Sequence, residues 1–299
     1  MSLDDTVDVP GPWEHRRVGA NGARFHVAVL GDGPLVVLLH GYPEFWWAWR
    51  HQIEPIAEAG WRVAALDLRG YGGSDKTPRG YDPATFTADV AGVIRTLGAR
   101  DAVIVGHDWG AYIAWAMAVI RPTHVRAVAA LSMPHPLVLR RGLLRGRHAR
   151  HLVGIQLPMV PERQLVGGDA AHVEALLRHW AAPDSKFPDP EAAARYRAAM
   201  SLWPAPHCAL EYQRWAVRSL FRVDGRRFAR RMAEPISAPV FQIHGGADRT
   251  IPPQTASRSS GHVTGPYRWL RLEDVGHFPH EEEPDRVTAA LLDWLPTLR

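Results

Sequence analysis

The sequence has little cysteine, no long apolar run and only a small excess of positive charge. Cys208 is the one cysteine among 299 residues, so the chain cannot form an internal disulfide, which fits a reducing cytoplasm. No stretch approaches the roughly 20 apolar residues of a membrane-spanning helix, and the acidic residues 1–10 lack the apolar region of a signal peptide. We therefore expect a cytoplasmic protein that does not span a membrane.

The charge is too evenly balanced to indicate a nucleic-acid partner. Lysine and arginine number 35 against 31 acidic residues, a formal net charge of +4. The densest basic run, residues 140–150, has no nucleic-acid-binding motif, and we interpret it as a solvated face. We expect no nucleic-acid partner, and the sequence leaves a homodimer open.

Short apolar runs alternate with helix-like stretches along the first part of the chain. The strands that this pattern predicts are residues 24–30, 35–39, 62–68, 102–105 and 125–131. Runs that are apolar on both faces suit a mostly parallel sheet covered by helices, so we predict an α/β fold.

The pattern changes after residue 134. Residues 135–233 contain no clear apolar strand run and resemble short helices broken by loops, whereas strands return at 240–243 and 268–272. We therefore predict a core formed by residues 1–134 and 234–299, with residues 135–233 inserted between its strands as a helical cap, or lid. A cap at this place would lie over the strand ends, where open α/β sheets bind ligands.

The most specific stretch is the turn around Asp108. A predicted strand enters it, a predicted helix leaves it, and small residues stand two before Asp108 (Gly106) and two and three after it (Gly110, Ala111). This is the spacing of a nucleophile elbow, whose usual centre is serine. A carboxylate in that place would attack an sp³ carbon and form an alkyl-enzyme ester. Alternatively, Asp108 only caps the helix that follows.

Two further residues complete a candidate triad. Asp248 and His277 each follow a late strand, and the chain order of nucleophile, acid and histidine is that of α/β-hydrolase triads. Singly, each could be an ordinary loop residue. His277 with His280 and Glu281 could also suggest a metal site, but no further ligand stands at a fitting spacing. We expect a reaction that needs neither a metal nor an organic cofactor.

Together these motifs resemble the epoxide hydrolases of the α/β-hydrolase superfamily. The resemblance spans residues 13–298 and rests on five elements, which are residues 40–43 (His-Gly-Tyr-Pro), 67–75, 106–110 and the turns that end at Asp248 and His277. It implies an oxyanion hole formed by the backbone N–H groups of Tyr42 and Trp109, and a cis peptide before Pro43. Candidate pocket residues are Pro43, Trp46 and Phe278. For most of the tryptophans, packing is the commoner role.

The resemblance also implies two cap tyrosines that donate hydrogen bonds to the epoxide oxygen. Tyr212 resembles the second of them, whereas His151 stands at the place of the first, with His148 as a neighbour that could take its role. An imidazole can donate as well, and it would make ring opening more sensitive to pH. Of the weaker candidates, Glu44 could orient its loop or cap a helix, and we expect His107 to hold the elbow through hydrogen bonds.

These features predict an epoxide hydrolase whose partners are a small apolar epoxide and water. Asp108 would form a hydroxyalkyl ester, and water activated by His277 and Asp248 would release a vicinal diol. One alternative is a haloalkane or haloacid dehalogenase with the same triad, in which Trp109 would donate to the departing halide. The other is a non-catalytic ligand-binding protein on the same fold.

Overall fold

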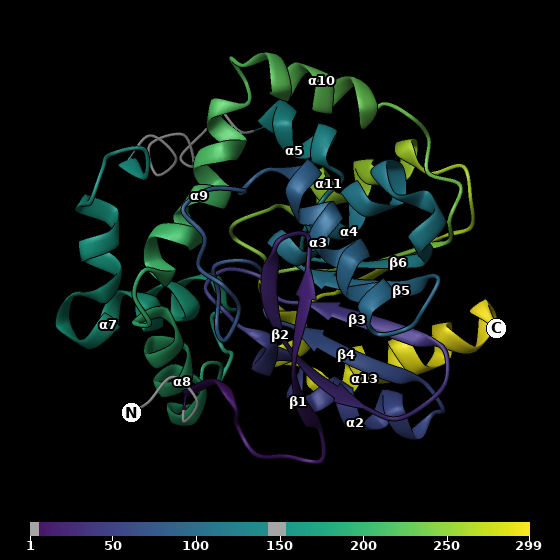
Figure 1. Ribbon diagram of the computed structural model, residues 1–299, viewed down its shortest axis with the longest axis horizontal. Coiled ribbons are helices and arrows are strands. Elements are labelled where there is room, and N and C mark those ends of the chain that lie inside the picture. Colours follow the sequence, from purple (N-terminus) through teal and green to yellow (C-terminus); the bar gives the residue numbers. More distant parts are fainter. Residues whose placement is uncertain (1–5, 143–153) are drawn as a thin grey trace.

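The computed structural model describes residues 6–142 and 154–299 (Figure 1). One eight-stranded sheet runs through this part of the chain. Its strands are β1 (Glu14–Ala20), β2 (Ala23–Leu30), β3 (Leu35–Leu39), β4 (Arg62–Leu66), β5 (Ala102–His107), β6 (Val125–Leu131), β7 (Val240–Gly245) and β8 (Tyr267–Leu272). The predicted α/β architecture is thereby confirmed, with strand ends shifted by up to two residues from those predicted.

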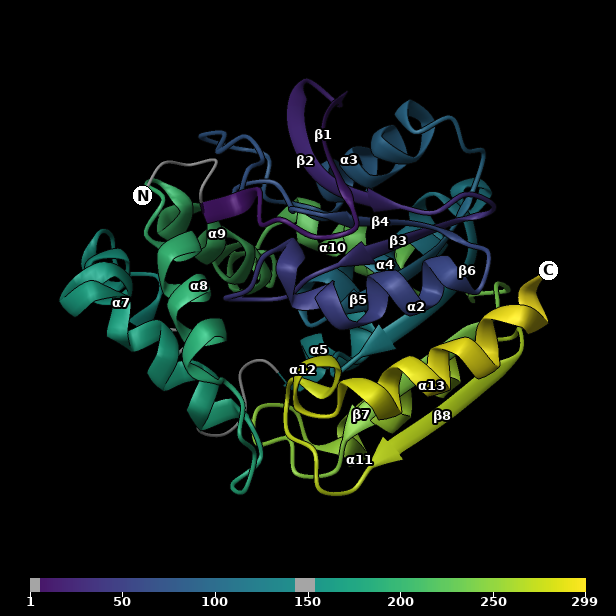
Figure 2. The same cartoon turned by 90° about the horizontal axis from the view of Figure 1, so that it is seen from below.

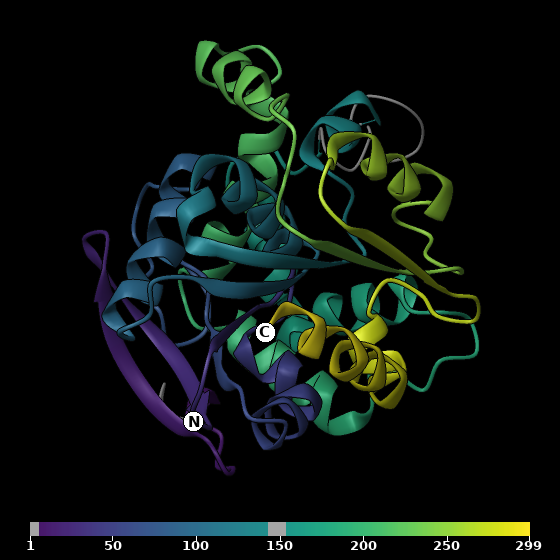
Figure 3. The ribbon, with the colours of Figure 1, turned by 90° about the vertical axis from the view of Figure 1, so that its right-hand side faces the viewer.

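The strands lie in the order β1-β2-β4-β3-β5-β6-β7-β8. β2 pairs antiparallel with β1 and β4, and every other neighbouring pair is parallel. Figure 3 shows the β1-β2 hairpin at one edge of the sheet and β7 and β8 toward the other. Every residue of β3, β5 and β7 is buried, as expected of central strands with helices on both faces.

Helices cover both faces of the sheet. The helices of the core are α2 (Arg50–Glu58), α3 (Pro83–Thr96), α4 (Trp109–Ile120), α11 (Pro253–Ala256), α12 (Pro279–Glu282) and α13 (Pro284–Trp294), with short 3₁₀ turns at Trp46–Trp49, Pro122–His124, Ser257–His262 and Leu295–Leu298. α3 and α4 pack together on one face, and α2 and α13 pack together on the other (Figures 1 and 2).

The strand β1 was absent from the predicted set. Four of its seven residues are polar and it lies at the sheet edge, so it carries no apolar run. The signal that reveals it is the turn that follows. Asn21 and Gly22 both have positive φ (45° and 73°), the backbone that a tight two-residue hairpin requires and that Asn-Gly supplies.

A set of helices lies between β6 and β7, as predicted from the change of pattern. These helices are α5 (Pro136–Gly142), α7 (Val160–Trp180), α8 (Pro190–Met200), α9 (Ala205–Arg218) and α10 (Val223–Arg231). Figures 1 and 2 both show α7, α8 and α9 to one side of the sheet. Hydrogen bonds join them to core loops, for example from the N–H of His277 to the carbonyl of Trp180 (3.0 Å).

None of the helices within residues 6–142 and 154–299 is both long and apolar enough to cross a membrane.

Candidate active site

Asp108 stands at a strained turn between β5 and α4. Its φ of 46° and ψ of −115° lie outside the regions that a non-glycine residue ordinarily adopts, which costs of order 1–3 kcal/mol. Its carboxylate makes no capping hydrogen bond to α4, so helix capping does not account for an aspartate here. A Cβ on Gly106 would lie 2.3 Å from the backbone of Gly110, and one on Gly110 would lie 2.1 Å from Leu39 O. Both glycines are therefore required by the close approach of strand and helix.

The structure brings the three predicted triad residues together. Asp108, Asp248 and His277 follow β5, β7 and β8, which are parallel, so their side chains meet at one edge of the sheet. His277 Nδ1 lies 2.9 Å from Asp248 Oδ2, and His277 Nε2 lies 3.7 Å from Asp108 Oδ1. All three side chains are buried. One imidazole thus lies between two carboxylates.

The turn after Asp248 holds that carboxylate in place. Asp248 Oδ1 accepts hydrogen bonds from the N–H groups of Thr250 (2.8 Å) and Ile251 (3.0 Å) and from the Thr250 hydroxyl (2.7 Å). Its other oxygen faces His277 (2.9 Å), with His244 Nε2 3.4 Å away. Burial would raise the pKa of Asp248, but the neighbouring His277 outweighs it and lowers the pKa to about 2. The supporting role of Thr250 was missed in the sequence, because a threonine two residues after an aspartate carries no distinctive signal.

The same arrangement changes the protonation of His277. Burial alone would lower its pKa, but the two carboxylates stabilise the imidazolium, and the pKa rises to about 10. Asp248 is the largest raising influence, and Asp108 adds to it. The two carboxylates together thus favour the protonated form of His277, and the charge of Asp108 contributes to that preference.

The Tyr42 loop contacts the other oxygen of Asp108. The N–H of Tyr42 donates to Asp108 Oδ2 (3.0 Å), at the place that the resemblance implied for an oxyanion-hole donor, and the expected cis peptide joins Tyr42 to Pro43. Trp109 begins α4, where a backbone N–H has no partner within the helix. No hydrogen bond from Trp109 N–H to the Asp108 side chain is formed among the residues described.

A buried glutamate holds three loops of the candidate site together. Glu44 Oε2 accepts from Gly41 N–H (3.1 Å) and contacts His107 Nδ1 (2.8 Å), and Glu44 Oε1 lies 3.3 Å from His280 Nε2. The opposite nitrogen of His107 contacts the carbonyl of His277 (2.8 Å). The pKa of Glu44 is held well below its usual value, because His107 and His280 outweigh the opposing effect of burial. The expected role of His107 in holding the elbow agrees with these contacts, and Glu44 orients its loop.

The metal alternative raised by His277, His280 and Glu281 is not formed. His277 turns to Asp248, and His280 turns to Glu44. Glu281 instead contacts Arg50 (2.8 Å) and the Tyr196 hydroxyl. The three residues thus face different partners.

Of the two predicted donors to a substrate oxygen, the structure describes Tyr212 but not His151. Tyr212, on α9, is fully buried, with its ring stacked on Phe86 (4.2 Å) and 6.0 Å from Trp109. Its hydroxyl donates to the backbone carbonyl of Arg69 (2.8 Å). His151, like His148, lies outside the described residues.

A second buried phenol lies beside the site and was missed in the sequence. Tyr71 is 2% exposed, and its hydroxyl finds no hydrogen-bond partner within residues 6–142 and 154–299. Its ring lies 5.5 Å from that of Tyr212. Burial, then Tyr42 and Asp108, raise the pKa of Tyr71 well above its usual value, which places the phenol within the field of the Asp108 carboxylate. The sequence offered one signal for Tyr71, which is its position inside the 67–75 element. That element was used only as part of the resemblance to the epoxide hydrolases.

The three predicted pocket residues have different surroundings. Phe278 is buried, with its ring 5.3 Å from that of His277 and 5.1 Å from that of Phe187. Pro43 lies in the Tyr42 loop and is buried. Trp46 instead donates its indole N–H to Val7 O (2.8 Å) and packs against the N-terminal segment, so its side chain is part of the core.

Comparison with known proteins agrees with this geometry. Residues 34–284 match the family model described as alpha/beta hydrolase fold. The chain is 33% identical to epoxide hydrolase A of Mycobacterium tuberculosis, over 95% of this chain and 97% of that one, and 31% identical to an epoxide hydrolase of Caballeronia sordidicola, over 99% and 97%. The crystal structure of epoxide hydrolase A from Mycobacterium thermoresistibile is similar, with a TM-score of 0.79 at 30% identity, covering 95% of this chain and 98% of that one. The chain therefore belongs to the epoxide hydrolases of the α/β-hydrolase superfamily.

Proposed function

We propose that this protein hydrolyses an apolar epoxide to a vicinal diol through a covalent ester on Asp108. The observation that carries the proposal is the position of the Asp108 carboxylate, with one oxygen on Tyr42 N–H and the other facing His277. Because Tyr42 N–H occupies Oδ2, Oδ1 is the oxygen free to attack a ring carbon. As the Oδ1–carbon bond forms, the carbon–oxygen bond of the ring breaks and the epoxide oxygen leaves as an alkoxide, which takes up a proton.

Ester formation then activates the base. Esterification removes the negative charge of Asp108, one of the two charges that raise the pKa of His277. His277 can then pass its proton to the group that protonated the alkoxide, become neutral and take a proton from water, while Asp248 keeps the ring oriented. Hydroxide attacks the Asp108 carboxyl carbon, and charge develops on the oxygen that Tyr42 N–H holds. Such a donor is typically worth about 3 kcal/mol. Cleavage of the ester, with return of the proton to the departing oxygen, releases the diol.

The epoxide oxygen needs a donor during ring opening. We propose that Tyr71 supplies one, since its buried hydroxyl has no partner among the described residues and its ring packs 5.5 Å from that of Tyr212, the other proposed donor. Tyr212 remains a proposed donor, and it would have to exchange the carbonyl of Arg69 for the substrate oxygen. His151 also remains proposed for the first tyrosine position. The insertion at residues 135–233 would act as the cap over this site.

Single-turnover hydrolysis in ¹⁸O-labelled water tests the ester. If water attacks the Asp108 carboxyl carbon, label enters the protein in the first turnover and reaches diol only in later ones. Label found directly in the first diol, with none in the protein, would contradict the proposal. Halide release from alkyl halides, with no diol formed from epoxides, would favour the dehalogenase alternative.

A further inference from the structure

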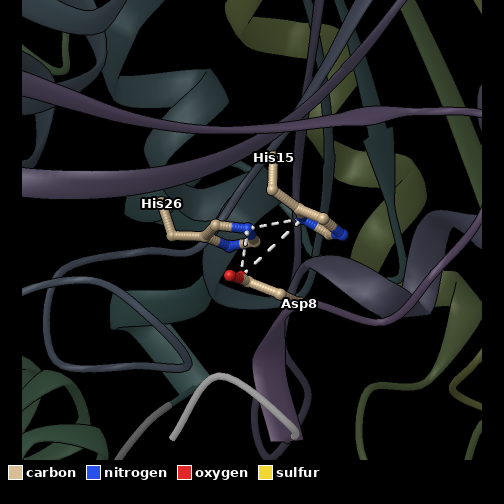
Figure 4. A group of neighbouring side chains, drawn as sticks. All are labelled: Asp8, His15 and His26. Carbon is tan, nitrogen blue, oxygen red and sulfur yellow. Dashed lines mark hydrogen bonds and ion pairs between the residues drawn. The ribbon is translucent and has the colours of Figure 1, made fainter.

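A second cluster of ionisable side chains lies on the N-terminal hairpin, apart from the triad. Asp8 precedes β1, His15 lies on β1 and His26 lies on β2, and Figure 4 shows their side chains pointing toward one another. His15 Nδ1 and His26 Nε2 are 2.9 Å apart, and Asp8 Oδ1 lies 3.5 Å from His26 Nε2 and 3.9 Å from His15 Nδ1. One ligand atom from each residue thus faces a shared point.

The opposite side of each imidazole determines which nitrogen carries the proton. His26 Nδ1 lies 2.8 Å from Asp67 Oδ2. Both oxygens of Asp67 already accept backbone N–H groups, from Gly73 and Trp46, so the carboxylate is an acceptor and His26 Nδ1 donates. In the neutral form of His26 the lone pair is therefore on Nε2.

His15 is held in the complementary tautomer. Its Nε2 lies 2.9 Å from the backbone carbonyl of Val9, which can only accept, so Nε2 donates and the lone pair is on Nδ1. When both rings are neutral, their lone pairs point at each other beside the carboxylate of Asp8, and a metal ion at this point would take the place of any proton that the two nitrogens share. An imidazole whose far nitrogen donates to a carboxylate or a backbone carbonyl is the usual form of a metal-binding histidine.

The distances fit a small transition-metal ion. A point equidistant from the three ligand atoms lies about 2.0 Å from each, which matches Zn–N and Zn–O bond lengths of roughly 2.0–2.2 Å. The side chains of His15 and Asp8 are 18% and 31% exposed, so an ion can reach the point from solvent. Arg17 also donates to Asp8 Oδ1 (2.8 Å), and this competition weakens the carboxylate as a ligand.

We propose that Asp8, His15 and His26 bind one divalent transition-metal ion of the Zn²⁺ type, with water completing the coordination. The bound ion would fasten the segment before β1 to the β1-β2 hairpin. It takes no part in ester chemistry, because its ligands are not among the residues that contact Asp108. The proposal is therefore independent of the proposed function.

Calorimetric titration of chelator-treated protein with ZnCl₂ tests the site. We expect about one ion per chain, with the affinity reduced at least about 10-fold in His15→Ala and in Asp8→Asn. The matched control is His172→Ala, which removes an exposed histidine elsewhere and should bind as the unaltered protein does. Addition of Co²⁺ should produce the visible absorption of a four-coordinate ion, and this absorption should be lost in His15→Ala.

The activity of the same variants separates loss of the ion from loss of the fold. His15→Ala and Asp8→Asn should keep the rate of diol formation of the unaltered protein. The proposal is overturned if no stoichiometric ion binds, so that only a proton is shared between the rings. It is equally overturned if both variants bind the ion as tightly as His172→Ala does.

Discussion

Replacing Tyr71 with phenylalanine should raise the stability of the protein and lower its activity. A buried hydroxyl without a partner costs about 1–3 kcal/mol of unfolding free energy, and Tyr71 has such a hydroxyl in the described structure. Tyr71→Phe keeps the ring, which packs 4.8 Å from that of His40, and removes only the unpaired oxygen. We therefore expect the free energy of unfolding to rise by about 1 kcal/mol, or the Tm by roughly 2–4 °C.

Activity should fall in the same variant. If Tyr71 donates to the departing epoxide oxygen, its loss slows ester formation by about 10²–10⁴-fold, the usual contribution of a general acid. Single-turnover kinetics of ester formation, beside urea denaturation, measure the two effects on one preparation. A variant that is more stable but fully active would refute the catalytic role, and one that is less stable would refute the unpaired hydroxyl.

Tyr212→Phe is the matched control, because Tyr212 is also a buried phenol but its hydroxyl is paired. Its removal leaves the Arg69 carbonyl without a donor, so the free energy of unfolding should fall by about 1–3 kcal/mol. Opposite signs of the stability change in the two variants would support the hydrogen bonding described for each. Which variant loses ester formation identifies the tyrosine that acts on the substrate oxygen.

Three further predictions concern the residues around the nucleophile. The pKa of His277 rises from 6.5 to about 10 on folding, so its contribution to stability is complete below pH 6.5 and is lost as pH rises through about 10. The pKa of Asp248 falls from 3.8 to about 2, so its contribution is present above pH 3.8 and is lost as pH falls through about 2. Thermal unfolding from pH 6 to 10 should show a decline in Tm that His277→Gln lacks. Glu44→Gln should lower the unfolding free energy by about 1.5–3 kcal/mol, because it replaces a buried carboxylate that accepts from Gly41 N–H and contacts His107, and a loss below 1 kcal/mol in chemical denaturation would contradict this. Gly110→Ala should abolish the folded elbow, since its Cβ would lie 2.1 Å from a backbone oxygen, and recovery of folded, active protein would show that the close approach is not required.

The meeting of the three candidate triad residues could be predicted from the sequence because each of them follows a predicted strand. Parallel strands bring their carboxyl ends to one edge, so strand positions alone placed Asp108, Asp248 and His277 together. The central strands were predicted well for the same reason, since β3, β5 and β7 are buried on both faces.

What the sequence left undetermined is the direction in which side chains point. Trp46 begins the 3₁₀ turn that follows the Tyr42 loop, yet its indole turns to Val7. Tyr71 and Tyr212 are both buried phenols, and only their tertiary contacts show that one hydroxyl is paired and the other is not. Likewise the meeting of His15 with His26 depends on the β1-β2 register, and β1 has no apolar run to reveal it.

The central claim is that Asp108 forms a covalent ester which His277 is needed to hydrolyse. Intact-protein mass spectrometry of His277→Gln, mixed with an excess of a small aryl epoxide, tests it most directly. We predict a lasting mass increase equal to one substrate molecule, located by peptide mapping on Asp108 and absent from His277→Gln that also carries Asp108→Ala. An unmodified protein that still releases diol, or an adduct that persists without Asp108, would contradict the account.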